Sequence, residues 1–288
     1  MLEMSLKVTN FGNIMKKRII LLILTAAGCF AGRHHAMAEE PMVAVFRENY
    51  VTTGIPLNAI PNWDTNDLTF QVSLRYNAFQ NIGDAAWDVF LAYTQFSIWD
   101  VYRASNPFRS NTYMPGIYAY HPLSKGPDGI VSDLLLGVEH RSNGYAGEES
   151  RSIDCLFATY TRTFAGRFTA QVTGRFGIGS IYNTFSLEMF NRYQGYCNIG
   201  LCYHTRDRRF MVSASVTPLF MGDIPANVTG EVAYMPLRKA DWFYLVARYH
   251  YGYDENQLDC AVPDVFLKHM LRVGIAVQPG LLSHKLSF

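Results

Sequence analysis

The dominant pattern in the sequence is an alternation of apolar and polar residues, which recurs in many short segments. The clearest segment is 167–176, which reads RFTAQVTGRF. Successive side chains of a β-strand point to opposite faces, so this pattern predicts a strand with one apolar and one polar face. The alternation, broken by turn residues, predicts about twelve strands, at 49–56, 69–76, 87–99, 116–123, 129–142, from about 152 onward, 167–176, 192–204, 210–217, 226–237, 241–253 and 271–278.

These strands predict an all-β protein built as one antiparallel barrel. No helical period, internal repeat or second domain is evident, and no apolar run reaches the roughly 20 residues that a membrane-spanning helix needs. A soluble barrel has an apolar lumen, whereas a transmembrane barrel has a polar lumen and an apolar outer face toward lipid. The alternation alone fits both arrangements.

The N-terminal region is typical of an export signal. Lys16-Lys17-Arg18 is basic, Ile19–Ala27 is apolar, and Ala36-Met37-Ala38 fits the small-residue pattern of a cleavage site. The sequence therefore predicts a cleaved signal peptide at 1–38. It predicts a mature chain at 39–288, consisting of a single barrel domain with a short N-terminal arm.

Aromatic residues favour the transmembrane arrangement. The last residue is Phe288, and outer-membrane barrels commonly end on an aromatic residue. Aromatic girdles mark the two membrane interfaces of such barrels, and candidates lie near the predicted strand ends at Trp87, Trp99, Tyr193 and Trp242. With the export signal, these features predict a transmembrane β-barrel of about twelve strands, with a polar lumen and an apolar outer face, in the outer membrane of a Gram-negative bacterium.

The overall charge excludes one class of partner. The chain has 288 residues and a formal net charge of +1, with 49% hydrophobic and 14% aromatic residues. A nucleic-acid-binding domain carries a strongly basic footprint, and none is present here. We therefore expect no nucleic-acid partner.

Segment 129–142 breaks the usual pattern at its end. Its charged residues fall on one face, while the other face carries apolar side chains followed by His140 and Ser142. Residues two apart on a strand have Cα atoms roughly 6.5–7 Å apart, and converging side chains can close that distance to a hydrogen bond. A histidine placed in this way can act as general base on a serine hydroxyl.

A third group is needed to orient the histidine and to stabilise its protonated form. Asp154 lies near the start of the next predicted strand, after the polar connection 143–152, and would be about 4.8 Å away if the strand pairs beside His140. The sequence thus predicts a Ser–His–Asp set on the outer wall. Each residue also has a simpler interpretation: an interfacial histidine, a serine in a glycine turn and an aspartate that caps a loop.

Two blocks of residues carry a resemblance to a known family. The chain resembles the outer membrane phospholipase A family of Gram-negative bacteria, from 49 to 288, with the remaining strands matching only in pattern. The first block is His140-Arg141-Ser142-Asn143-Gly144, followed by Ser150-Arg151-Ser152. The second block comprises Tyr93-Thr94-Gln95, Trp99, Pro107-Phe108-Arg109, Asn111 and Tyr113-Met114-Pro115.

The resemblance implies a function and a site. It implies a twelve-stranded barrel that hydrolyses the acyl ester bonds of phospholipids and lysophospholipids, with His140 as general base and Ser142 as nucleophile. It also implies a homodimer that depends on calcium, with Gln95 at the dimer seam. The calcium ligands would be the Ser150 hydroxyl, the Tyr145 carbonyl and the carbonyl of Ser105 of the partner subunit, with waters completing the 6–8 oxygen ligands that calcium takes.

The chain departs from the family pattern at two places. The third catalytic residue of the family is asparagine, whereas this chain has Asp154, and the spacing between Trp99 and Pro107 is shorter than usual. A carboxylate orients a histidine as an amide does, so we still expect activity.

Two other classes of protein remain open at this point. A non-enzymatic channel or scaffold barrel would place its function in the lumen-facing charges, such as Glu139, Arg141, Arg167 and Arg175. A soluble secreted binding barrel would stay monodisperse without detergent.

Overall fold

The computed structural model of the chain describes residues 42–83, 86–127, 129–179, 192–220, 224–237, 242–253 and 268–277. The predicted signal peptide at 1–38 and the terminal Phe288 lie outside these residues. Among the described residues, no helix is long and apolar enough to cross a membrane.

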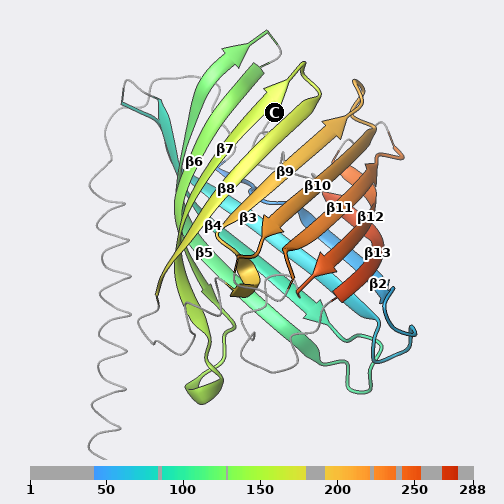
Figure 1. Cartoon of the computed structure of the whole chain (residues 1–288). Coiled ribbons are helices and arrows are strands. Elements are labelled where there is room, and N and C mark those ends of the chain that lie inside the picture. The colour runs from blue at the N-terminus through green and yellow to red at the C-terminus, as the bar shows by residue number, and fades with distance from the viewer. Residues whose placement is uncertain are drawn as a thin grey trace, which may run out of the picture. The chain divides into compact units, whose positions relative to one another are not determined.

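The described residues form thirteen strands, a short 3-10 helix and a helical turn at 192–194 (Figure 1). The helix, η1, spans Gly147–Glu149. The strands are β1 (Val43–Val45), β2 (Asn49–Pro56), β3 (Asp67–Ile82), β4 (Trp87–Trp99), β5 (Phe108–Gly126), β6 (Gly129–Ser142), β7 (Ser152–Phe164), β8 (Phe168–Gly179), β9 (Cys197–His204), β10 (Phe210–Pro218), β11 (Ala226–Tyr234), β12 (Phe243–Gly252) and β13 (Lys268–Val277).

Strands β2 to β13 close into a twelve-stranded antiparallel barrel, as the sequence predicts. Each strand pairs with its neighbours in the chain, and β13 pairs with β2 from Met270↔Pro56 to Val277↔Asn49. The remaining strand, β1, adds to the edge of β3 beyond the end of β2.

The largest differences from the predicted strand boundaries are in β3, β5 and β9. β3 ends at Ile82 rather than at 76. β5 begins at Phe108 rather than at 116, because its first residues carry polar side chains such as Asn111 on the outward face, where the pattern requires apolar ones. β9 begins at Cys197 rather than at 192, because residues 192–194 are helical and Gly195 has a φ of 65°, in the left-handed region outside the extended range of a strand.

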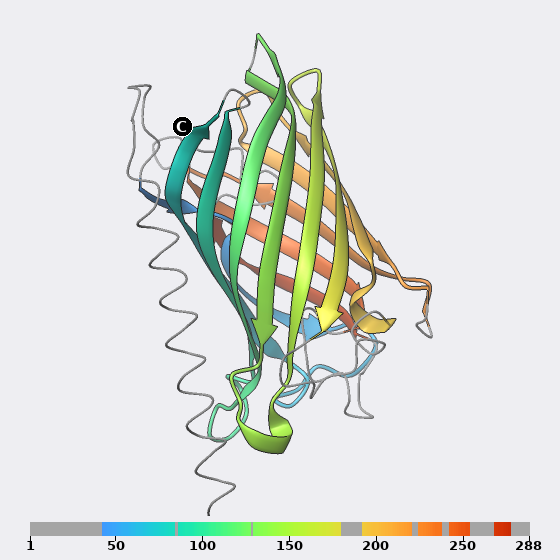
Figure 2. The same cartoon turned by 90° about the vertical axis from the view of Figure 1, so that its left-hand side faces the viewer.

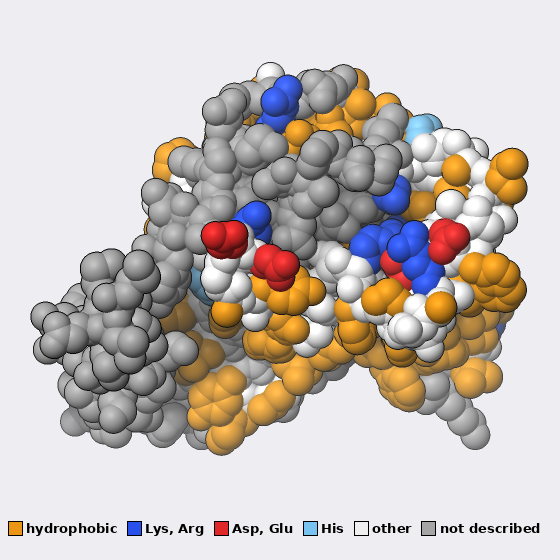
Figure 3. Space-filling model, turned by 90° about the horizontal axis from the view of Figure 1, so that it is seen from below, with side chains coloured by type: hydrophobic (Ala, Val, Ile, Leu, Met, Phe, Trp, Pro, Cys, Tyr) orange, Lys and Arg blue, Asp and Glu red, His pale blue; other side chains and the backbone are white. Residues whose placement is uncertain are grey.

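The two faces of the barrel have the inverted polarity that the sequence predicts for a membrane. The outward side chains are large and apolar and are exposed, for example Leu136, Val138 and Val273. Figure 3 shows hydrophobic side chains along the side of the barrel and charged side chains gathered on the end face. The lumen instead holds buried polar and charged side chains, including Asp67, Arg75, Glu139, Arg141, Glu231, Arg248 and Arg272.

The predicted N-terminal arm enters the lumen. β1 pairs with β3 from Val43↔Tyr76 to Val45↔Leu74, and the chain rejoins the sheet in β2. Between these strands, the side chains of Phe46, Arg47 and Glu48 turn inward. Phe46 is 2% exposed and packs against lumenal aromatic rings.

Candidate functional site on the outer wall

The strand register places Asp154 of β7 directly opposite His140 of β6. His140 Nδ1 and Asp154 Oδ1 are 2.7 Å apart, which is a short hydrogen bond from the ring N–H to the carboxylate. This bond fixes the tautomer, so that Nε2 is left as the basic nitrogen. The predicted pairing of the two side chains is therefore present in the fold.

The pair lies on the lipid-facing wall, near the end of the strands. The His140 side chain is 42% exposed and that of Asp154 is 28% exposed. His140 follows the exposed Leu136 and Val138 on the same face of β6. Figure 2 views this wall, with β6 and β7 side by side and the loop that joins them below. A lipid molecule in the membrane can therefore approach the imidazole from outside the barrel.

Ser142 ends β6, two residues after His140 and on the same face. Its cross-strand partners are Tyr113 of β5 and Ser152 of β7. Among the described residues, no hydrogen bond joins its hydroxyl to the histidine ring. Catalytic hydrogen bonds are often long in an enzyme without substrate and tighten when substrate binds. The serine thus lies two residues from the histidine on the same face of β6, without a hydrogen bond to its ring among the described residues.

The loop between β6 and β7 is organised around one buried amide. Asn143, 3% exposed, accepts hydrogen bonds from the backbone N–H groups of Tyr145 and Arg151 and donates one to the Glu149 carbonyl. The loop also needs two left-handed residues, Gly144 and Gly147, with φ of 78° and 67°. The motif His-x-Ser-Asn-Gly therefore builds the loop as well as carrying the histidine and serine.

The oxygen atoms of this loop fit a calcium ion. Within the described part of the chain, neither the Tyr145 carbonyl nor the Ser150 hydroxyl makes a hydrogen bond. The carbonyls of Glu148, Glu149 and Ser150 are instead occupied by Arg151 or Asn143. Uncharged hydroxyl and carbonyl oxygens are hard ligands of the kind that calcium accepts. The described residues contain no cluster of three or more His, Cys, Asp or Glu side chains, so water would have to complete the coordination shell.

The third predicted ligand, Ser105, lies in a separate loop between β4 and β5. Ser105 and Asn106 have φ of 66° and 44°, a left-handed conformation that non-glycine residues adopt at a cost. Trp99 Nε1 donates to the Asn106 carbonyl at 2.9 Å, and the Asn106 N–H donates to the Arg103 carbonyl at 3.1 Å. Among the described residues, the Ser105 carbonyl accepts no hydrogen bond. The loop therefore holds this carbonyl in a fixed and unoccupied position.

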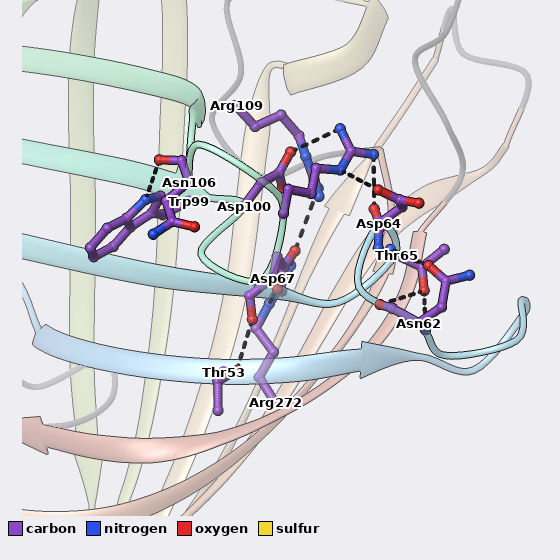
Figure 4. A network of polar contacts seen from close by, with 11 residues as sticks. Thr53, Asn62, Asp64, Thr65, Asp67, Trp99, Asp100, Asn106, Arg109 and Arg272 are labelled. Carbon is purple, nitrogen blue, oxygen red and sulfur yellow. Dashed lines mark hydrogen bonds and ion pairs between the residues drawn. The ribbon is translucent and has the colours of Figure 1, made fainter.

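A network of ion pairs anchors the Ser105 loop to the barrel rim (Figure 4). Asp100 pairs with Arg109 and with Arg103, the latter at 3.2 Å. Arg103 also pairs with Asp64 of the β2–β3 loop at 3.3 Å. Asp67 in turn accepts hydrogen bonds from Arg272 of β13. Of these residues, only Arg109 stands in a motif quoted above. The contacts with Asp64 and between Asp67 and Arg272 join distant parts of the chain, so no local pattern predicts them.

A chain of polar side chains crosses the outer wall on β4 and β5. The Tyr93 hydroxyl donates to Gln95 Oε1 at 3.3 Å, Gln95 Nε2 donates to the Ser97 hydroxyl at 3.2 Å, and Ser97 donates to Asn111 Oδ1 at 2.7 Å. Gln95 is the cross-strand partner of Tyr113, which neighbours Ser142 on the next strand. Of this chain, only Gln95 was predicted to have a role. The polar residues at outward positions of β5 interrupt the apolar alternation, and this interruption is the sequence feature that marks the polar chain.

The fold and this site define a class of protein: a transmembrane β-barrel with a serine and a histidine–aspartate pair on its lipid-facing wall. Residues 40–262 match the phospholipase A1 family, and the chain belongs to that family. A protein of Neisseria meningitidis serogroup B named as a phospholipase A1 is 33% identical over 93 residues, which are 31% of this chain and 24% of that protein. The chain thus aligns with about a quarter of the length of this relative.

Solved structures show the same barrel. The outer membrane phospholipase of Salmonella typhi, a dimer with bound calcium, matches with a TM-score of 0.68 at 21% identity, over 82% of this chain and 92% of that chain. Outer membrane phospholipase A of Escherichia coli matches with a TM-score of 0.68 at 20% identity, over 83% and 99%. An E. coli variant whose active-site asparagine is replaced by alanine matches with a TM-score of 0.67 at 19% identity, over 85% and 95%. At these identities the likeness concerns the fold.

Proposed function

We propose that this protein is an outer-membrane phospholipase that hydrolyses the acyl ester bonds of phospholipids and lysophospholipids. One observation carries the proposal: the His140–Asp154 hydrogen bond lies beside Ser142 on the lipid-facing wall, where a lipid ester can reach it. Membership of the phospholipase A1 family supports the same substrate class.

The proposed chemistry is acyl transfer through serine. The Ser142 oxygen attacks the ester carbonyl carbon while His140 Nε2 takes the hydroxyl proton, and Asp154 stabilises the resulting imidazolium. Collapse of the tetrahedral intermediate breaks the ester bond, and the departing alkoxide takes the proton from His140. Water then attacks the acyl-serine with the same base, which releases the fatty acid and restores Ser142.

The negative charge on the tetrahedral intermediate needs stabilisation. The Ser142 amide N–H is a candidate donor to the oxyanion. The Tyr145 carbonyl and the Ser150 hydroxyl would hold calcium in the adjacent loop, together with the carbonyl of Ser105 of the partner subunit. When bound, calcium would supply positive charge close to the developing oxyanion.

We propose that the active form is a homodimer. A single convex barrel wall offers no cleft for an acyl chain, whereas two walls in contact form a groove between them. The polar chain from Tyr93 to Asn111 supports a seam at β4 and β5, because amide groups facing lipid are stabilised by partners across an interface. The ion pairs at the rim also support a dimer, because they anchor the loop whose Ser105 carbonyl would face the second subunit.

A channel or scaffold is the rival function, and the lumen disfavours it. Of its predicted functional charges, Glu139 and Arg141 are 0% and 4% exposed, and Glu139 is paired with both Arg141 and Arg47. Glu139 and Arg141 are paired and covered, so they contribute little to an ion path. Of the other two predicted charges, Arg167 is exposed and Arg175 is partly exposed. The exposed polar groups of the outer wall have no comparable structural explanation.

The deciding experiment is a phospholipid hydrolysis assay in detergent micelles, with calcium and with a chelator. We expect hydrolysis with calcium, a loss of most activity with chelator, and crosslinked dimers under the calcium and substrate conditions that give activity. Folded protein that hydrolyses no lipid in calcium would contradict the enzymatic function. Full activity in a sample shown to be monomeric would contradict the dimer alone.

A further inference from the structure

The backbone pairing of β6 is interrupted on one side at the proposed histidine. The ladder with β5 includes Gly116↔Glu139 and Tyr113↔Ser142, but it does not include His140, which would face Pro115 in this register. Pro115 has no N–H to donate to a ladder. On the other side, β7 pairs with every residue of β6 from Glu139 to Ser142. The segment that carries His140 is therefore held by backbone pairing mainly from one side.

On the lumenal side of this segment, the N-terminal arm supplies a second attachment. Arg47 forms an ion pair with Glu139 Oε2 at 2.7 Å and donates to the Tyr118 hydroxyl at 3.2 Å. Its guanidinium also lies 5.8 Å from the centre of the Phe157 ring. Arg47 thus contacts β5, β6 and β7, the three strands that carry the proposed site on their opposite face.

Glu139 connects this attachment to the site. Its carboxylate is fully buried and accepts hydrogen bonds from the Tyr118 hydroxyl and, at 2.8 Å, from Arg141 Nε. Glu139 precedes His140, and Arg141 stands between His140 and Ser142. The lumenal groups that bind Arg47 are therefore on the same stretch of backbone as the two proposed reactive residues.

Two glycines shape the wall for this contact. A Cβ atom on Gly137 would lie 2.2 Å from Tyr118 Cδ1, and one on Gly116 would lie 2.8 Å from Tyr118 Cε2. The Tyr118 ring therefore lies flat on the lumenal wall, where its hydroxyl reaches Glu139. Phe46 packs on the same ring, with 4.7 Å between ring centres, and fixes the arm beside Arg47.

The next residue of the arm binds a different part of the barrel. Glu48 pairs with Arg248 of β12, which also donates to Glu231 of β11 at 3.0 Å. Neighbouring residues of the arm are thus attached to β6 and to β12. The arm therefore connects strands that are not adjacent in the barrel, and its contact with β12 can be altered without removing the partners of Arg47.

We propose that Arg47 is a positioning residue for His140 and Ser142, acting through Glu139 from inside the barrel. This inference rests on the proposed function of the outer wall. Without Arg47, the Glu139 carboxylate would keep Arg141 and Tyr118 as partners but lose the ion pair that joins this part of β6 to the N-terminal arm. His140 and Ser142 would then sample geometries that are unsuited to proton transfer.

The test compares Arg47→Gln and Arg47→Lys with Glu48→Gln, which alters the arm at its contact with β12. In calcium-containing micelles, we expect Arg47→Gln to lower kcat about tenfold at unchanged KM, below the roughly 10²-fold that a 1 Å misplacement can cost. Arg47→Lys keeps the charge opposite Glu139 and should recover part of kcat. Glu48→Gln should keep kcat within about twofold, because the partners of Arg47 remain.

A second measurement is independent of hydrolysis. The ring signals of His140, identified in NMR spectra by their absence from a His140→Asn variant, should change in Arg47→Gln and stay in place in Glu48→Gln. Tyr118→Phe removes only one hydroxyl and should shift the His140 ring signals in the same direction as Arg47→Gln. This variant replaces Arg47→Gln in the test if Arg47→Gln does not fold.

The outcomes separate this inference from the proposed function. Folded Arg47→Gln with wild-type kcat and wild-type His140 signals would overturn the inference, and so would an equal loss of kcat in Glu48→Gln. If Arg47→Gln does not fold, wild-type kcat and His140 signals in Tyr118→Phe would overturn it. A wild type that hydrolyses nothing would refute the phospholipase function, while the His140 signals would still decide whether Arg47 positions the ring.

Discussion

Near the proposed site, β6 and β7 carry polar side chains on both the lumenal face and the outer face. The two sets differ in how many hydrogen-bond and ion-pair partners they have. In the lumen, Glu139 has Arg47, Arg141 and Tyr118 as partners and is fully buried. On the outer wall, His140 is 42% exposed and has Asp154 as its partner. A buried charge without a partner is costly, so the fold depends on the ion pairs in the lumen.

On the outer wall, by contrast, the polar side chains do not stabilise the fold. The surroundings of this wall are lipid, where an apolar side chain would serve the fold better at every position. A histidine, a serine, an aspartate and a glutamine there weaken the fit to the membrane and need a functional reason. Substitutions of the proposed reactive groups on the outer wall should therefore change activity and leave stability alone. Substitutions of lumenal charges that do not contact Glu139 should do the reverse.

Ser142→Ala should abolish hydrolysis and leave the barrel folded. Loss of a serine nucleophile typically lowers kcat by about 10⁴-fold or more, while the alanine methyl fits the lipid-facing surface. Hydrolysis in micelles measures the first effect, and heat-modifiable gel migration measures the second. Ser132→Ala, on the same strand but distant from the site, is the matched control and should keep its activity. Turnover retained in Ser142→Ala would remove Ser142 as the nucleophile.

Asp154→Ala should lower kcat roughly 10²-fold or more, because nothing then orients the His140 ring. Asp154→Asn should stay clearly active, since an amide can still accept the ring N–H bond. Hydrolysis in calcium-containing micelles compares the kcat of both variants with that of the wild type.

The two variants give separate answers about Asp154. An alanine variant as fast as the wild type would exclude Asp154 from the site. An asparagine variant as slow as the alanine variant would show that the site needs the charge of Asp154 and not only its hydrogen bond to the ring. Heat-modifiable migration of both variants should match that of the wild type, because the side chain faces the lipid interface.

A lumenal substitution should show the reverse pattern. Arg248→Met removes the partner of Glu231 and Glu48 and leaves two buried carboxylates without their cation. Breaking a buried ion pair costs about 3–5 kcal/mol, so the temperature of heat-modifiable migration should fall. The kcat of the folded fraction should remain close to that of the wild type, because Arg47 keeps its contacts with β6. An unchanged migration temperature would show that lumenal pairs are dispensable for the fold.

The outer wall could be predicted from the sequence to a large extent, and the lumen could not. Strand alternation is local, so the face of His140 follows from its neighbours, and a hairpin between β6 and β7 brings Asp154 opposite. The contact between Glu48 and Arg248 instead joins residues 200 positions apart. Nothing local in the sequence specifies which lumenal charges will meet across a closed barrel.

At the start of β5, residues of the proposed seam obscure the strand pattern in the sequence. Its outward positions, Asn111 and Tyr113, are polar or amphipathic at the level of the site, so the alternation does not mark a strand there. The prediction was late because the residues serve the proposed seam rather than the lipid contact. A failure of the pattern inside a barrel strand is therefore itself a pointer to a site.

The smallest effect should come from Gln95, whose amide bonds to Tyr93 and Ser97 on the outer wall. Gln95→Leu should weaken calcium-dependent dimerisation about threefold, since interhelical polar contacts in membranes average about 0.6 kcal/mol and we expect a similar scale between barrels. Crosslinking yield against protein concentration measures the effect. Leu245→Ala, an exposed residue of β12 outside the proposed seam, is the control and should dimerise as the wild type does. Because leucine is more compatible with lipid than glutamine, Gln95→Leu should also leave the migration temperature unchanged. Equal dimerisation of Gln95→Leu and wild type would place the seam on another part of the wall.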